Sequence, residues 1–238
     1  MKRTMKFWTF LLAVLAVAAS PVCADSLTQG DLLFDLNQVY ADSATPQGTP
    51  PWLTATFQNL GPNSVQLSMN SSGLTPGSTE YISSWFFNFN PSSEVLGLAI
   101  IPQSEIVADP IMKATDGAIA GGDLSFDIEF SFAPNSFNAG KTSIYLISSN
   151  AAGQPIDALF FDFLSTNNNT PVSTNYYSAA NILGITGGLN SWIAAATAQT
   201  PSPGPGPGPA PVPEPATMIL LGCGLSGLMI FGRKKLLT

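Results

Sequence analysis

The chain of 238 residues is long enough for one sandwich-sized domain with processing segments, and too short for two full domains. Hydrophobic residues make up 45% and charged residues 10% of the chain. Disordered proteins have few hydrophobic and many charged residues, so this composition excludes that class. Histidine is absent, so Ser-His-Asp and Cys-His nucleophiles and His-ligated metal sites are excluded as well.

Charge is distributed unevenly along the chain, which has a formal net charge of −7. Six of the eight basic residues lie within the first six or the last six positions, and 14 of the 15 acidic residues lie between residues 25 and 213. Only Lys113 and Lys141 are basic in that segment. Because so few cations cannot neutralise a row of phosphates, we expect no nucleic-acid partner and no binding to an anionic membrane surface.

The amino terminus has the pattern of a cleavable secretion signal, which we place at residues 1–24. A basic start is followed by an apolar run over residues 7–19, and small residues precede a cleavage position between Ala24 and Asp25. The apolar run is short for a membrane span. An uncleaved anchor and a lipoprotein cysteine at Cys23 are the alternatives, and both fit the pattern less well.

The middle of the chain, residues 25–200, is predicted to be one all-β domain, an antiparallel sandwich of the jelly-roll-like kind. Short stretches of period-two patterning alternate with turns rich in Gly, Pro and Asn, and only residues 194–198 show helical spacing. The predicted strands cover residues 32–36, 52–58, 65–69, 81–89, 96–101, 123–132, 143–149, 158–164 and 176–185.

The clearest of these strands is predicted over residues 123–132. Its apolar side chains, every second residue from Leu124 to Phe132, face one way, and its polar side chains face the other. We therefore expect one face of this strand to pack in a core and the other to meet water.

Three acidic side chains of this strand, Asp123, Asp127 and Glu129, share the polar face. Carboxylate oxygens are the ligands that Ca²⁺ prefers, so these residues are a candidate calcium site if a nearby loop adds further ligands. A solvated acidic face explains the same residues, and the spacing of an EF-hand loop is absent.

Trp52, Trp85 and Trp192 are candidates for stacking on sugar rings, because each offers a flat aromatic face. Packing in the core explains the same residues. A glycosidase would need two carboxylates across a cleft, a condition that 14 acidic residues meet by number alone.

The carboxyl terminus consists of three zones. Residues 201–215 alternate proline with small residues and are predicted to be an extended linker. Residues 216–232 are uncharged and mostly apolar, at the lower limit for a membrane-spanning helix. Arg233, Lys234 and Lys235 follow directly, and the positive-inside rule places them in the cytoplasm with the domain outside.

The order Val212, Pro213, Glu214, Pro215, then an apolar helix with glycines and a basic cluster, resembles the PEP-CTERM sorting signal. The resemblance covers residues 212–235. It implies recognition by an exosortase, a multipass membrane enzyme that cuts near the Pro-Glu-Pro motif, in Gram-negative bacteria that make exopolysaccharide. A plain anchor after a proline stalk is the alternative.

These observations predict an exported surface or extracellular-matrix protein with a structural or adhesive role in exopolysaccharide or biofilm. No catalysis and no cofactor are expected. The expected partners are the exosortase, exopolysaccharide, and the membrane before processing. The alternative is a carboxylate-dependent glycan-active enzyme.

Overall fold

The computed structural model describes residues 30–42, 44–90, 92–121, 124–150, 155–167 and 174–200. The predicted signal peptide with its cleavage position at Ala24 and Asp25 lies outside the described residues. So do the linker, the predicted membrane helix and the sorting motif, namely Pro213, Glu214, Pro215, Arg233, Lys234 and Lys235.

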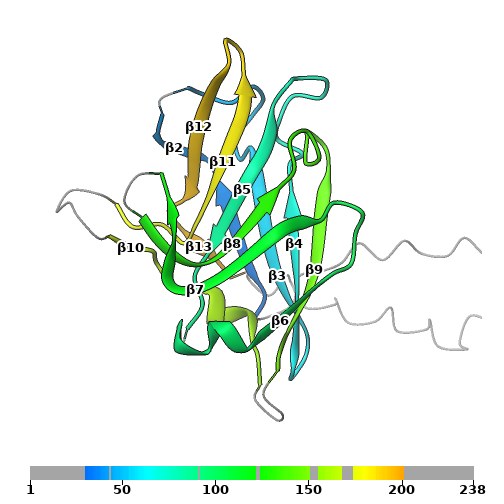
Figure 1. The fold of residues 1–238 in the computed structure, drawn as a ribbon, viewed down its shortest axis with the longest axis vertical. Helices are drawn as coiled ribbons and strands as arrows, with labels where there is room; N and C mark the ends of the chain where they lie inside the picture. The colour runs from blue at the N-terminus through cyan, green and yellow to red at the C-terminus, as the bar shows by residue number, and fades with distance from the viewer. Residues whose placement is uncertain are drawn as a thin grey trace, which may run out of the picture.

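The described residues form two antiparallel sheets that pack face to face (Figure 1). Sheet A has six strands, in the order β13 (Ala198–Gln199), β1 (Leu32–Leu36), β3 (Leu53–Gly61), β4 (Ser64–Asn70), β9 (Thr142–Ser149) and β6 (Leu98–Pro102). The prediction of an all-β antiparallel sandwich is confirmed.

Sheet B has seven strands, six of which follow one another in the order β10 (Thr166–Asn167), β8 (Leu124–Phe132), β5 (Tyr81–Phe87), β11 (Ser178–Ile185), β12 (Leu189–Ala195) and β2 (Gln38–Ala41). The seventh, β7 (Ala108–Ala120), pairs with β8. Bulges interrupt the regular pairing of β5 with β11, of β12 with β2 and of β7 with β8.

Sheet A has one buried and one solvent-facing side, because its long strands alternate strictly. Leu67 of β4 pairs with Phe57 of β3 and with Tyr145 of β9, and all three side chains are buried. Paired residues lie on the same face, so this alternation places every second residue in the core.

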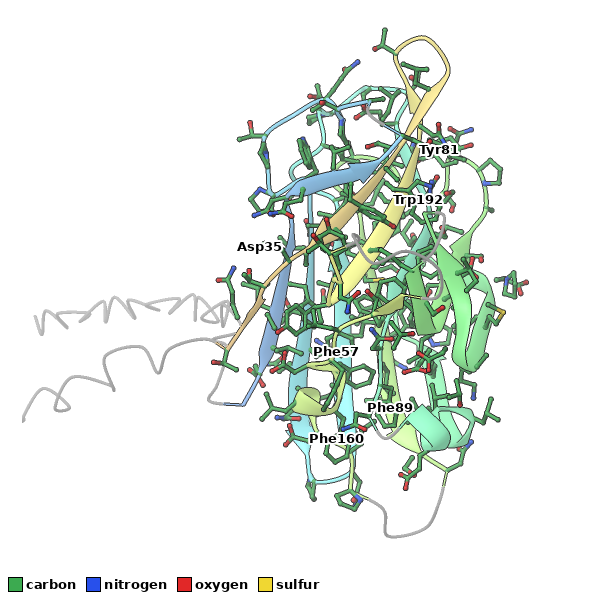
Figure 2. All side chains as sticks on the ribbon, turned by 90° about the vertical axis from the view of Figure 1, so that its left-hand side faces the viewer. Asp35, Phe57, Tyr81, Phe89, Phe160 and Trp192 are labelled. Carbon is green, nitrogen blue, oxygen red and sulfur yellow. The ribbon has the colours of Figure 1, made fainter. Side chains whose placement is uncertain are left out.

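Aromatic rings join the two sheets across the core. The ring of Phe57 in sheet A lies 5.1 Å from that of Phe87 in sheet B, edge to face, and 5.9 Å from that of Phe34. It stacks at 4.1 Å on Phe161, which belongs to the short 3-10 helix η2 (Ala158–Phe161). Figure 2 shows Phe57 between the sheets, with Phe89 and Phe160 nearer one end of the sandwich.

A second, smaller apolar cluster covers part of the outer face of sheet B. We call it the outer cluster; its buried members are Phe86, Ala118, Ala120, Leu124, Phe126, Tyr176, Ala179 and Ala194. Strands β8 and β11 are therefore buried on both faces over much of their length.

The outer cluster corrects the prediction for the strand that is now β8. Leu124 and Phe126 pack in the outer cluster, whereas Ile128, Phe130 and Phe132 pack in the main core. The direction of the apolar side chains therefore reverses at Asp127, which is itself buried rather than solvent-facing. The reversal coincides with a bulge in the pairing of β7 with β8.

Two further sequence predictions are wrong, and the longest described strand was missed. Residues 158–161 form the helix η2 instead of a strand, because Asp157 caps it by accepting a hydrogen bond from the Leu159 amide at 2.8 Å. Residues 194–198 are not helical: they end β12 and begin β13. The thirteen-residue β7 was not predicted, since Pro110 and the Asp116-Gly117 pair interrupt its alternation.

Replacing Phe57 by alanine tests the aromatic contact between the sheets. We expect Phe57→Ala to lower the free energy of unfolding by about 3–5 kcal/mol, because a buried ring is lost and a cavity remains. Leu60→Ala is the matched control on the same strand; this side chain is 52% exposed, and a change within about 0.5 kcal/mol is expected. Urea unfolding measures both, and equal losses in the two variants would contradict the assignment.

Candidate functional site

Two of the three tryptophans that are candidates for sugar stacking lie inside the fold. Trp85 has 0% of its surface exposed, and its Nε1 donates a hydrogen bond to Ser178 Oγ at 2.9 Å. Trp52 is 6% exposed. Neither can stack on a sugar, because a stacking ring must present one whole face to the ligand. Both residues act in packing instead.

Trp192 points away from the main core and is half-buried. Its neighbour Ile193 on β12 faces the main core, so the alternation of the strand turns the indole to the outer face of sheet B. The indole centroid lies 5.7 Å from the ring of Phe86 and 6.4 Å from that of Tyr40. Figure 2 shows Trp192 and Tyr81, which is also half-buried, on the same side of the sandwich.

Trp192 stands at one end of a row of side chains that crosses four strands. Asn181 of β11 is the cross-strand partner of Trp192, and it also pairs with Ser84 of β5. Ser84 in turn pairs with Ser131 of β8. We call these four residues the Trp192 row. Its two central side chains, Asn181 and Ser84, are 6% and 8% exposed, and its two ends are half-buried.

Two β-bulges shape the Trp192 row. Ser83 is an extra residue of β5 opposite β11, and Tyr40 is an extra residue of β2 opposite β12. A bulge turns a side chain out of the regular alternation. Ser83 Oγ consequently donates a hydrogen bond to Asn181 Oδ1 at 3.0 Å, and the Tyr40 ring lies beside the indole. The bulges therefore fix the orientation of one amide and one indole.

The outer face of sheet A offers no comparable arrangement among its described strands. The aromatic residues on those strands are Phe34, Phe57 and Tyr145, and all three are buried in the core. The residues that face outward there are mostly hydroxyl and amide side chains, such as Thr56, paired with Ser68. Among the described strands, a half-buried aromatic ring on an outer sheet face is thus found in sheet B and not in sheet A.

The predicted calcium ligands are not assembled among the described residues. Asp123 lies outside them. Both carboxylate oxygens of Asp127 accept hydrogen bonds from backbone amides, Oδ2 from Phe89 at 3.0 Å and Oδ1 from Asp116 at 2.9 Å. In the described part of the chain, no group of three acidic or cysteine side chains is placed to hold a metal ion.

Asp127 is instead a structural carboxylate that joins the segment after β5 to the bulge of β7. Burial raises the pKa of Asp127, although its two backbone hydrogen bonds act in the opposite direction, and the neighbouring Asp116 adds to the increase. Thr166 Oγ1 donates a hydrogen bond to Asp116 Oδ1 at 2.9 Å, which holds the same bulge from the side of β10.

Glu129 is the acidic side chain of β8 that lies next to the Trp192 row. It pairs across the strands with Phe86 of β5 and with Met112 of β7, and it is half-buried. One carboxylate oxygen accepts a hydrogen bond from Ser131 Oγ at 3.0 Å. The row therefore has an indole at one end and a hydroxyl–carboxylate pair at the other.

Sequence reasoning identified Trp192 and Glu129 but missed Asn181, Ser83 and Ser84. Asn181 is separated from Ser84 by roughly a hundred residues, and their pairing depends on strand register rather than on any local pattern. No motif in the sequence marks these three residues.

Comparison with known families finds one match, at the end of the chain. Residues 211–235 match the family described as the PEP-CTERM protein-sorting motif. The tail is a PEP-CTERM sorting signal. Comparison with curated proteins and with solved structures gives no match.

The PEP-CTERM signal decides where the protein goes. A chain that carries it is exported and sorted by an exosortase to the cell surface of a Gram-negative bacterium. The match over residues 211–235 agrees with the predicted sorting signal over residues 212–235; the two differ by one residue at the start and end together at Lys235. Among the described residues, no helix is long and apolar enough to cross a membrane.

The titration of Asp127 can be tested through the pH dependence of stability. Because its native pKa is raised, the native state binds more protons than the unfolded chain, and stability falls as the pH rises from the ordinary value of 3.8 through the native pKa. Asp127→Asn removes the titrating group. We therefore expect the free energy of unfolding of the variant to fall less steeply with pH than that of the wild type, whatever its absolute value. Urea unfolding between about pH 3.5 and pH 7 measures the slope; an unchanged slope would contradict the raised pKa.

Proposed function

We propose that the protein is a non-catalytic, adhesive component of an exopolysaccharide or biofilm matrix, and that it binds the polymer through the Trp192 row. The glycan chain lies across strands β12, β11, β5 and β8 on the outer face of sheet B. The indole stacks on a sugar ring, and the half-buried Ser131 at the other end of the row hydrogen-bonds to sugar hydroxyls. The buried Asn181 and Ser84 form the floor between these two contacts.

The observation that carries the proposal is the alignment of one half-buried indole with three polar side chains by strand register. Two bulges hold the indole and the amide in place before any ligand arrives. Preorganised side chains lose little conformational entropy on binding, which favours a function in recognition.

The position of the chain ends supports the same proposal. β13, the last described strand before the linker, pairs with β1, the first strand of the domain, with Gln199 opposite Leu33. Both ends of the domain therefore leave from one edge of sheet A, whereas the Trp192 row lies on the outer face of sheet B.

Removal of the indole tests the proposed function. We expect Trp192→Ala to weaken binding of the mature protein to the producer's exopolysaccharide at least about fivefold, because the aromatic stacking contact is lost. Leu189→Ala, an exposed residue on the same strand, should bind as the wild type does. Co-sedimentation with the polymer measures binding.

Two further measurements keep this test decisive. Trp192→Leu retains apolar contact with Phe86 but lacks the flat face, so it should lose binding with little loss of thermal stability. Wild-type binding by both Trp192 variants would contradict the proposal. Release of reducing ends from a glycan, abolished in Glu129→Gln, would instead favour the glycan-active enzyme.

The intact mass of the protein recovered from cells and from the medium tests its processing. We expect a chain that begins at Asp25 and ends close to the segment from Pro213 to Pro215, because the signal peptidase and the exosortase each remove one terminal segment. A full-length mass in both fractions would contradict both cleavages.

A further inference from the structure

We infer that the polymer bound at the Trp192 row carries positively charged amino groups, and that Glu129 selects for them. The chemical class is a hexosamine polymer with free amines. This inference rests on the proposed function and adds to it the charge of the ligand and the residue that reads that charge.

The first observation is the position of Glu129. Its side chain lies on the outer face of sheet B, since its partner Phe86 belongs to the outer cluster and its strand neighbours Ile128 and Phe130 belong to the main core. Ser131 Oγ donates to its carboxylate at 3.0 Å, so the acid is tied to the end of the Trp192 row. A glycan chain of several sugars that runs along the row from the indole reaches this carboxylate, because neighbouring strands lie about 4.8 Å apart.

The second observation is that neither of the two described lysines is placed to pair with Glu129 on the outer face of sheet B. Lys113 pairs with Ile128, whose side chain faces the main core, and its Nζ donates to the carbonyl oxygens of Leu96 at 3.2 Å and Leu98 at 2.5 Å. Lys141 immediately precedes β9 of sheet A, and its backbone is held by Ser71. Within the described residues, Glu129 therefore has no lysine across the row.

The third observation is a carboxylate at the opposite side of the row. Asp42 follows β2, and its Oδ2 accepts a hydrogen bond from Asn190 Nδ2 of β12 at 3.1 Å. Asn190 is two residues from Trp192 on the same strand and points the same way. Acidic groups thus lie near both ends of the row, which gives this face a negative potential.

Charge complementarity decides between three classes of polymer. A polyuronate or a phosphorylated glycan would bring like charges against Glu129 and Asp42, which lowers affinity. A neutral polymer donates hydroxyl hydrogen bonds to these carboxylates but forms no ion pair with them. An amine on the sugar gains a charge-assisted hydrogen bond with Glu129, and the excess of carboxylates over the two lysines of the domain attracts it from a distance.

The test compares three polymers with the mature protein at low ionic strength: a β-linked glucosamine polymer with free amines, its N-acetylated form, and a polyuronate. We expect the order free amine, then N-acetylated, then polyuronate. Glu129→Gln should lower the preference for free amine over N-acetylated polymer by about two- to fivefold, the range for a solvent-exposed ion pair.

Glu105→Gln is the matched control, because it removes the same charge from an exposed position between β6 and β7. It should keep the wild-type preference, which separates a specific contact from the net charge of the protein. Raising the salt concentration should reduce the preference in the wild type, since exposed charges are screened.

The outcomes separate this inference from the proposed function. Equal, Trp192-dependent binding of the free-amine and N-acetylated polymers would overturn the inference and leave the proposed function standing. Equal losses of preference in Glu129→Gln and Glu105→Gln would also overturn it. Failure of the wild type to bind any of the three polymers or the producer's exopolysaccharide would overturn both.

Discussion

The contact between aromatic rings of the two sheets is the constraint on which the rest of the structure depends. Both cysteines of the chain, Cys23 and Cys223, fall in the terminal segments, so no disulfide links the described strands. Burial must stabilise the domain instead, and Phe57 concentrates it by contacting rings from both sheets and from η2. Because the inner faces are occupied by this core, any function of the sheets must use their outer faces.

The outer face of sheet B acquires its chemical character from departures from regular pairing. An extra residue in β5 and another in β2 turn Ser83 and Tyr40 toward the Trp192 row, and the buried carboxylate of Asp127 accompanies a reversal in β8. Strands that pair regularly over most of their length, such as those of sheet A, present mainly the alternation of their sequence. Bulges therefore convert one sheet face into a preorganised surface, whereas the other stays a flat polar face.

The sorting signal and the β-sandwich are separate parts of this protein. The PEP-CTERM signal is a short local pattern that covers residues 211–235, after the last described strand. The domain in turn joins the linker through β13, a two-residue strand at the edge of sheet A. Because the family match covers only the tail, the sorting signal by itself says nothing about what the domain does.

The sequence by itself determined the destination, the all-β class and most strands, because each depends on residues that are close together in the chain. The basic cluster after the apolar run, the Pro-Glu-Pro motif and the alternation of residues 65–69 are all local signals. Only the tertiary structure decided that Trp85 is buried while Trp192 faces outward, and that Asp127 binds backbone amides. These properties depend on the register between strands far apart in the sequence, where a shift of one residue reverses every side chain.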